Sequence, residues 1–456
     1  MAARKISLSI VLTCLAALAN WGSVWAQMAA TEPMPAADMA LLERLEAAEA
    51  RLRELERAQA NRPAWFAGYN RGFIIRPSDA EQNPYELRIN GRIQFRHVGF
   101  ARDIDQWVDN AGVVRPVMNR NDFEIERGRL EFRGFFHDPN LQFYINLDAD
   151  TDDKHVVIFH DFWMNYKFSD ALDVYIGKAF VPGSRDWLSG STRTRFTDRS
   201  MATTFFRPDR TLGIWVIGEP RDNLFYRVMV GNGFNTTDLT PSEIDTRFVY
   251  SGSMWAHLGD YGDGYSDLEW HEEPAAQIGH SFTFASDDGR DASGRPLAEE
   301  NFVRLSDGTR LTQTGALAPG VTVDHFEIYL YTVDAAFKYR GFSANAEYFF
   351  RWLRSIRGDG PLPLHSMYDN GFYAEAGYFL IPERFEIIAR LSQIYGAFGD
   401  AQQYAGGFNW FVDGTHNRKL TFEAAKLNHN PANNSGPNLR AGDDGLLFQT
   451  QLQLAF

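Results

Sequence analysis

Cysteine is nearly absent from this sequence of 456 residues. The single cysteine, Cys14, lies in an N-terminal segment in which Arg4 and Lys5 precede an apolar run over residues 6–18. A charged start followed by such a run is typical of a secretory signal peptide. We therefore expect residues 1–26 to be cleaved off, which leaves a mature chain without disulfides or a catalytic thiol. An alternative is a lipoprotein, in which Cys14 would carry the anchor.

Long apolar runs are also missing. Beyond the signal segment no run reaches the ~20 residues that a membrane-spanning helix needs, and the mean hydropathy of the chain is -0.34. Such values describe most soluble proteins. They also fit a membrane β-barrel, because its strands alternate apolar and polar residues and give a weak average signal. Any membrane crossing by this chain has to be made by strands.

The short motifs of common enzymes and nucleotide-binding proteins are missing as well. There is no G-x-S-x-G, no P-loop and no dinucleotide fingerprint. His271 has no second histidine at metal-binding spacing, and Asp148, Asp150 and Asp152 lack the later glycine and glutamate of a calcium loop. We therefore predict no enzymatic activity, no cofactor, no metal and no nucleic-acid partner.

A short helix is predicted ahead of the main body of the chain. Apolar residues recur there at spacings of 4, 3, 4 and 3, at Leu41, Leu45, Ala48, Leu52 and Leu55. This is the seam of a coiled coil over about two heptads. We predict a periplasmic linker and coiled-coil helix over residues 27–62, followed by a linker over 63–84. The alternative is a single solvated helix, which is marginally stable alone in water.

From residue 85 to residue 456 the pattern has a period of two, which is typical of β-strands with one polar face. Short turn-like joints occur near residues 137–140, 169–170, 219–222, 339–341, 381–384 and 413–416. Longer polar connections alternate with them, at 102–121, 150–155, 180–210, 232–245, 287–323, 354–369, 396–403 and 429–444. Alternating short and long joints predict an all-β fold, an antiparallel up-and-down transmembrane barrel of about sixteen strands. The joint at 257–274 fits less well, because it is long and acidic where a tight turn is expected.

The C-terminal strand is the most specific single signal. In GLLFQTQLQLAF one face holds Leu446, Phe448, Thr450, Leu452, Leu454 and Phe456, the other holds Gln449, Gln451 and Gln453, and the chain ends on Phe456. Outer-membrane barrel assembly recognises a final amphipathic strand that closes on phenylalanine. As an edge strand of a soluble protein the same segment would promote aggregation.

Arginines are concentrated in two places. The connection 180–210 holds six arginines against three aspartates, in a chain with a net charge of -14. Six more share faces of the first two strands. Those faces must point inward, because a charged side chain facing lipid costs about 2 to 4 kcal/mol at mid-membrane. The loop set is Arg185, Arg193, Arg195, Arg199, Arg207 and Arg210, and the wall set is Arg88, Arg92, Arg96, Arg127, Arg129 and Arg133.

These twelve arginines are predicted to line an anion path. Guanidinium suits phosphate because its planar fork donates two hydrogen bonds and keeps its charge. Single contacts in an aqueous pore are weak, and conduction needs sites that release the ion as well as attract it. Arg193, Arg195 and Arg199 are favoured for the narrowest point. The alternative for the wall set is ordinary scaffolding, paired with Glu86, Glu124, Glu126 and Glu131.

Several stretches together resemble the phosphate-selective porin O and P family of Gram-negative outer membranes. They are FEIERGRLEFRG with the following NLQFYINLD, then YIGKAFVPGSRDWLSGSTRTRFTDRS, FFRPDRTLGIW and the terminal Phe. The resemblance implies a sixteen-stranded trimeric barrel whose third external loop folds inward and narrows the pore. Residues 180–210 form the third long connection, so they take the place of that loop.

The arginines and the resemblance predict an outer-membrane porin that admits small anions passively, with inorganic phosphate as the first candidate. Its partners are then outer-membrane lipid, the barrel assembly machinery that recognises Phe456, and two further copies of the chain. An alternative in the same class is a weakly selective general diffusion porin. Alternatives from other classes are a barrel-embedded hydrolase and a structural barrel that anchors the cell wall through its helix.

Overall fold

The computed structural model describes residues 36–60, 65–79, 83–151, 156–236, 239–262, 264–291, 293–298 and 302–456. The predicted signal peptide, residues 1–26, lies outside this part of the chain. The chain separates into two compact units, Met1–Ala64 and Trp65–Phe456.

The first unit contains helix α2, Ala36–Ala60, where a helix is predicted. Its seam leucines Leu45, Leu52 and Leu55 are each more than half exposed. They are available to pair with other helices, and the coiled coil stays a prediction. No helix in the described part of the chain is both long and apolar enough to cross a membrane.

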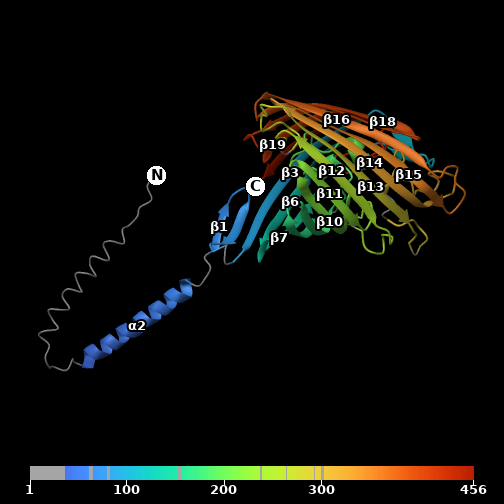
Figure 1. Cartoon of the computed structure of the whole chain (residues 1–456). Helices are drawn as coiled ribbons and strands as arrows, with labels where there is room; N and C mark the ends of the chain where they lie inside the picture. Colours follow the sequence, from blue (N-terminus) through green and yellow to red (C-terminus); the bar gives the residue numbers. More distant parts are fainter. Residues whose placement is uncertain are drawn as a thin grey trace. The chain divides into compact units, whose positions relative to one another are not determined.

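The second unit is a closed antiparallel β-barrel, and its sixteen strands in the described residues confirm the predicted fold class (Figure 1). Each strand pairs with the next along the chain. The barrel strands are β3 (Tyr85–Arg102), β6 (Arg120–Phe136), β7 (Asp138–Ala149), β8 (Ile158–Ser169), β9 (Leu172–Phe180), β10 (Arg210–Arg221), β11 (Leu224–Gly231), β12 (Val249–Leu258), β13 (Ala275–Asp288), β14 (Val323–Tyr339), β15 (Phe342–Gly358), β16 (Met367–Ile381), β17 (Phe385–Gly396), β18 (Gly399–Phe411), β19 (Arg418–Asn428) and β20 (Gly445–Ala455).

The last strand closes the barrel on the first. β20 pairs with β3 in a register that places Leu454 opposite Ile93 and Gln451 opposite Arg96. The backbone of Phe456 exchanges hydrogen bonds of 3.0 and 3.3 Å with that of Gly91. The faces divide as predicted, because the glutamines of β20 are buried while Leu446, Leu452 and Leu454 are exposed on the outside.

Two further strands lie where a linker is predicted over residues 63–84. β1 (Trp65–Tyr69) and β2 (Phe73–Pro77) form a hairpin, and β2 pairs with β3 through Ile74 and Arg88. The hairpin is possible because Arg71 and Gly72 adopt positive φ angles of 53° and 131° in its turn. β2 therefore pairs with the part of β3 that lies beyond the end of β20.

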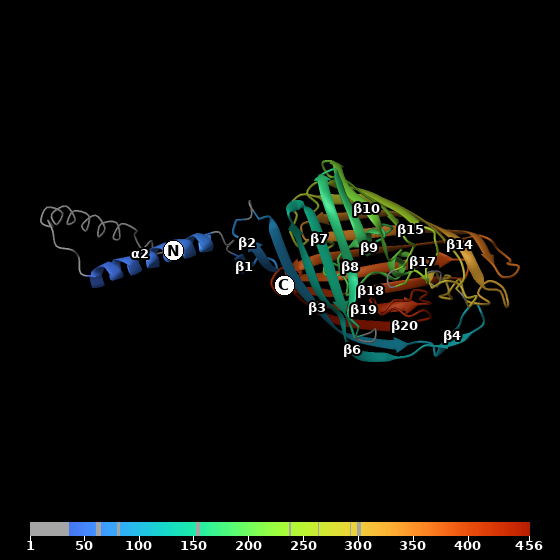
Figure 2. The same cartoon turned by 90° about the horizontal axis from the view of Figure 1, so that it is seen from below.

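The connections alternate between the two ends of the barrel as predicted. Most long connections lie at one end, called the long-loop end here, and the C terminus lies at the opposite, tight-turn end (Figure 2). One long connection holds a small hairpin of β4 (Gln106–Val108) and β5 (Val114–Pro116). The prediction for 396–403 is wrong in length, because only residues 397 and 398 separate β17 from β18.

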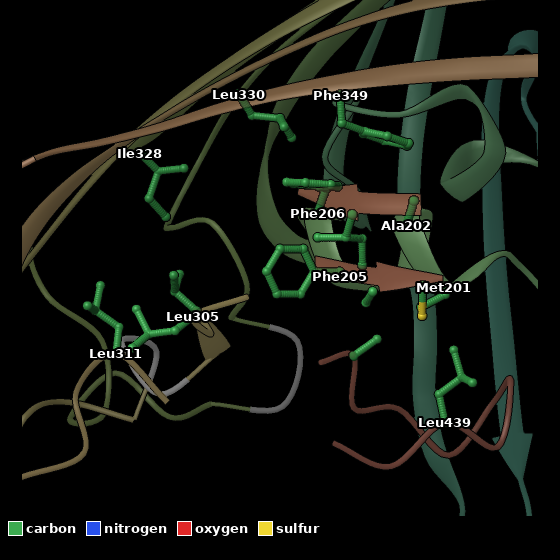
Figure 3. Close-up of a cluster of buried hydrophobic side chains, with 14 of the residues drawn as sticks. Met201, Ala202, Phe205, Phe206, Leu305, Leu311, Ile328, Leu330, Phe349 and Leu439 are labelled. Atoms are coloured by element: carbon green, nitrogen blue, oxygen red, sulfur yellow. The ribbon is translucent and has the colours of Figure 1, made fainter. Parts of the chain in front are cut away.

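An apolar cluster fills part of the barrel interior near the long-loop end. Helix α4 (Met201–Phe206), in the connection between β9 and β10, is buried over its whole length. The ring of Phe206 stacks on Phe349 of β15 with centroids 5.2 Å apart. Figure 3 shows these rings with Leu305, Leu311, Ile328 and Leu330, which come from the 289–322 connection and from β14. Each buried phenylalanine contributes about 1.5 to 3 kcal/mol, so this cluster holds the two connections inside the barrel.

Candidate functional site in the barrel lumen

The wall arginines lie on the inward faces of β3 and β6. Arg88 is directly opposite Arg133, and Arg92 is directly opposite Arg129. A register shift next to Gln94 turns two consecutive residues of β6, Glu126 and Arg127, toward the interior. The two predicted columns of arginines therefore lie on neighbouring strands.

Burial of these arginines increases from the tight-turn end toward the long-loop end. Arg133 is exposed, Arg88 and Arg92 are half-buried, and Arg129 is buried. Arg88 pairs with Glu86 at 3.2 Å, Arg92 with Glu131 at 3.2 Å and Arg129 with Asp148 at 2.7 Å. Among the described residues no carboxylate lies within 4.0 Å of Arg133. Paired scaffolding, the alternative from the sequence, thus describes most of the wall set but not this guanidinium.

Arg96 joins four parts of the interior. Its side chain is fully buried and donates to Gln451 on β20 at 2.7 Å. It also donates to the carbonyl of Gly436, in the 429–444 connection, and to that of Thr197 at 3.4 Å. An arginine with all these neighbours holds the loops in place and has no contact with water.

Residues 181–209, called the inward loop here, lie against the inner faces of β15 and β17–β19. Their backbone N–H groups donate to inward side chains of the wall: Arg185 to Glu347 at 3.0 Å, Thr197 to Glu423 at 2.9 Å, Met201 to Gln403 at 2.9 Å and Ala202 to Ser392 at 2.9 Å. The short helix α3 (Arg185–Leu188) begins the loop, with Ser184 as its N-cap. The wall thus offers a set of acceptors that matches the loop backbone.

The arginines of the inward loop have different environments. Arg195 is fully buried, 3.4 Å from Glu386, and donates to the carbonyl of Tyr265 at 2.7 Å. Arg199 is also buried and donates to the carbonyl of Ser189 at 2.6 Å, over the ring of Trp187. Arg193, which precedes both of them in the sequence, is exposed. Two of the three arginines favoured for the narrowest point are therefore internal to the loop.

Asp198 shows how tightly the loop is tied to the wall. It forms ion pairs with Arg127 of β6 and, at 3.2 Å, with Arg199. Burial raises the pKa of Asp198, but the guanidinium groups of Arg127, Arg199 and Arg96 outweigh burial and hold this pKa below its ordinary value. The carboxylate is therefore charged at neutral pH and neutralises one wall arginine.

Arg185, Arg207 and Arg210 complete the predicted set. Arg210 pairs with Asp161 of β8 at 2.9 Å, and Arg207 pairs with Asp209 at 3.3 Å. Arg185 donates to Asn345 and to Tyr261, and it lines a cavity of about 690 Å³ beside β11–β14.

Two arginines that sequence reasoning missed lie beside Arg207. Arg304 and Arg310 face each other across an antiparallel bridge in the 289–322 connection, and with Arg207 they line a cavity of about 240 Å³. Burial and the like charges of Arg310, Arg115 and Arg207 together lower the pKa of Arg304 to about 10. Within the described residues neither Arg304 nor Arg310 has a carboxylate within 4.0 Å. The acidic composition of this connection concealed the pair.

No group of three or more His, Cys, Asp or Glu side chains in the described residues is placed to hold a metal ion. The chemistry that these side chains offer is electrostatic: guanidinium groups with mixed carboxylates around a lumen.

Solved structures with the same fold include a porin, an outer-membrane protein and an outer-membrane channel. An anion-selective porin from Comamonas acidovorans is 12% identical, with a TM-score of 0.50 over 82% of this chain and 100% of that chain. OmpT of Vibrio cholerae in its trimer form is 10% identical, with a TM-score of 0.51 over 82% and 99%. The channel DcaP of Acinetobacter baumannii is 10% identical, with a TM-score of 0.51 over 82% and 97%. At these identities the likeness shows the fold alone.

No curated protein matches the chain in sequence. The family model described as "Phosphate-selective porin O and P" matches residues 100–260, which include β6–β12 and the inward loop. The partial family match and the closed barrel both support an outer-membrane porin. Over residues 100–260 the chain is thus similar to the phosphate-selective porins O and P, the family that the sequence resembles.

Proposed function

We propose that this porin passes small anions by passive diffusion, with inorganic phosphate as its first candidate. The observation that supports the proposal most directly is the pairing of like charges on the wall, Arg88 opposite Arg133 and Arg92 opposite Arg129. Like charges directly opposite each other destabilise a sheet. Two such pairs that face the lumen create a positive electrostatic potential there, and this potential attracts anions.

The inward loop is proposed to narrow the pore. Its burial against β15 and β17–β19 leaves the cavity beside β11–β14 for solutes. Arg96, Arg195 and Arg199 hold the loop, since each is buried and bonded to carbonyl or carboxylate groups. The path is assigned to the arginines with exposed or half-buried guanidinium groups: Arg88, Arg92, Arg133, Arg185 and Arg193.

The cavity of Arg207, Arg304 and Arg310 is proposed as the collecting site at the outer mouth. Phosphate carries one or two negative charges and several acceptor oxygens, so it can bridge two guanidinium groups that share no carboxylate. Each contact is worth about 1 kcal/mol in water and more at lower dielectric. Contacts of this size attract the ion without trapping it.

The assembly is proposed to be a trimer in the outer membrane, with the long-loop end outside and helix α2 in the periplasm. OmpT of Vibrio cholerae, which shares the fold, has a trimer form. The exposed leucines of α2 supply a seam through which three helices can pair. The assembly machinery and lipid are the remaining proposed partners, through the C-terminal strand and the apolar outer face.

Planar-bilayer recording tests the proposal. In a potassium chloride gradient the reversal potential should show anion preference, and phosphate added to one side should reduce the chloride current. Cation preference would contradict an anion porin. Anion preference without block by phosphate would favour the weakly selective diffusion porin, which the many wall carboxylates also support.

A further inference from the structure

A second segment enters the lumen from the tight-turn end. Residues 259–274, called the lower segment here, join β12 to β13, and all of them except residue 263 are described. Four side chains are almost fully buried: Tyr261, Tyr265, Ser266 and Asp267. A connection that only reversed the chain in water would leave such side chains exposed. The lower segment therefore packs inside the barrel.

The lower segment meets the inward loop through its two tyrosines. The hydroxyl of Tyr265 donates to Asp186 at 3.0 Å, and its carbonyl accepts from Arg195 at 2.7 Å. Arg185 donates to the hydroxyl of Tyr261 at 2.9 Å and lies over the ring of Tyr265 at 4.9 Å. Buried tyrosine hydroxyls need such partners. Segments from opposite ends of the barrel are thus bonded to each other in the lumen.

The wall also holds the lower segment. Ser266 donates to Glu386 of β17 at 2.8 Å. Asp267 accepts from the backbone N–H of Gly341, between β14 and β15, at 2.7 Å. Lys338 of β14 donates to the carbonyl of Tyr261 at 3.1 Å. Each of these buried partners would lose a hydrogen bond if the segment moved out, and a buried group left unpaired costs about 1 to 3 kcal/mol.

The space beside this junction is the cavity of about 690 Å³ that Arg185 lines. Its other walls include Arg227 of β11, His280 of β13 and Asp334 of β14, together with the rings of Tyr261 and Tyr265. The junction therefore closes one side of the lumen and leaves a polar chamber on the other.

We propose that the lower segment is a second constriction, and that the aperture is set jointly by this segment and the inward loop where Arg185 meets Tyr261 and Tyr265. Solutes pass beside the junction, through the chamber against β11–β14. The inference rests on the proposed porin function. It predicts that the tight-turn end limits conductance as much as the inward loop does.

Shortening the lower segment tests this directly. Leu258 is opposite Ala276, so replacing residues 260–274 by Asn-Gly makes Gly259 and Ala275 the next opposed pair in the same register. Single-channel conductance in potassium chloride should rise at least twofold. Unchanged conductance in a variant that folds and inserts normally would overturn the constriction. If the shortened variant conducts and the wild type does not, the result supports the second constriction and contradicts the proposal that the wild-type protein is an open porin. If neither conducts, both proposals fail.

A disulfide keeps the inference testable if the shortened barrel does not fold. A Cβ built at Gly264 lies 3.9 Å from the Cβ of Arg193, within the range for a disulfide. The double variant Arg193→Cys/Gly264→Cys should form the bond, and its conductance should be the same before and after reduction, because the junction persists while ions pass. A lower conductance when the bond is formed would contradict the proposal. Gly264→Cys alone is the control, since the only other cysteine is Cys14.

Discussion

The two arginine sets of this barrel have the same chemistry and different surroundings. On β3 and β6, Arg88 and Arg133 stand opposite each other near water, and Arg133 has no carboxylate within 4.0 Å in the described residues. In the inward loop, Arg195 and Arg199 are buried and bonded to carbonyls and carboxylates. A buried guanidinium bonded to protein groups stabilises structure, whereas one that faces water with a like charge opposite is available to a passing anion. The environment of an arginine decides its role, and the number of arginines in a loop does not.

The largest effect is expected from removing a loop arginine. Arg195→Met removes the buried cation that pairs with Glu386 and one donor to the carbonyl of Tyr265, which should destabilise the barrel by about 3 to 5 kcal/mol. Urea unfolding of the barrel in lipid vesicles measures this loss. Arg193→Met, in the same loop but at an exposed position, is the matched control and should unfold like the wild type. Equal stability of the two variants would remove the distinction between buried and exposed arginines.

A smaller effect is expected at the outer mouth. In Arg304→Gln/Arg310→Gln, the phosphate concentration that halves the chloride current should rise about tenfold, equivalent to about 1.4 kcal/mol. The control is Arg290→Gln in the same connection, because Arg290 is paired with Asp324 at 2.6 Å and lies outside that cavity. A similar rise in both variants would indicate a general loss of charge and not a site.

The smallest effect on permeation is expected from helix α2. Deleting residues 38–60 removes the exposed seam leucines but no barrel residue. The trimer should dissociate at a lower temperature in detergent, as seen by gel mobility, while single-channel conductance stays at the wild-type value. An unaffected trimer would show that the helix has no part in assembly.

Much of the fold could be predicted because a barrel wall repeats one local rule. Alternation of apolar and polar residues gives the faces, and turn residues give the joints, so the strand count and the placement of the wall arginines followed from short stretches of sequence. The difficult joint at 257–274 is also a single connection between neighbouring strands.

The contents of the lumen could not be predicted in the same way. They depend on contacts between residues far apart in the chain, such as Tyr265 with Asp186 and Arg207 with Arg304. Composition was a poor guide there, since an acidic connection supplies Arg304 and Arg310 while a basic one buries Arg195. The apolar residues of α4, within a polar loop, were the one local signal that the loop packs inside.

The reversal potential of Arg88→Gln/Arg133→Gln in a potassium chloride gradient tests the central claim most directly. Because this pair faces water on the wall, the reversal potential should move from anion preference toward zero. The unfolding free energy should change by no more than about 1 kcal/mol, since a like-charged pair is removed. An unchanged reversal potential in a stably folded variant would contradict the assignment of the anion path to the arginines of β3 and β6.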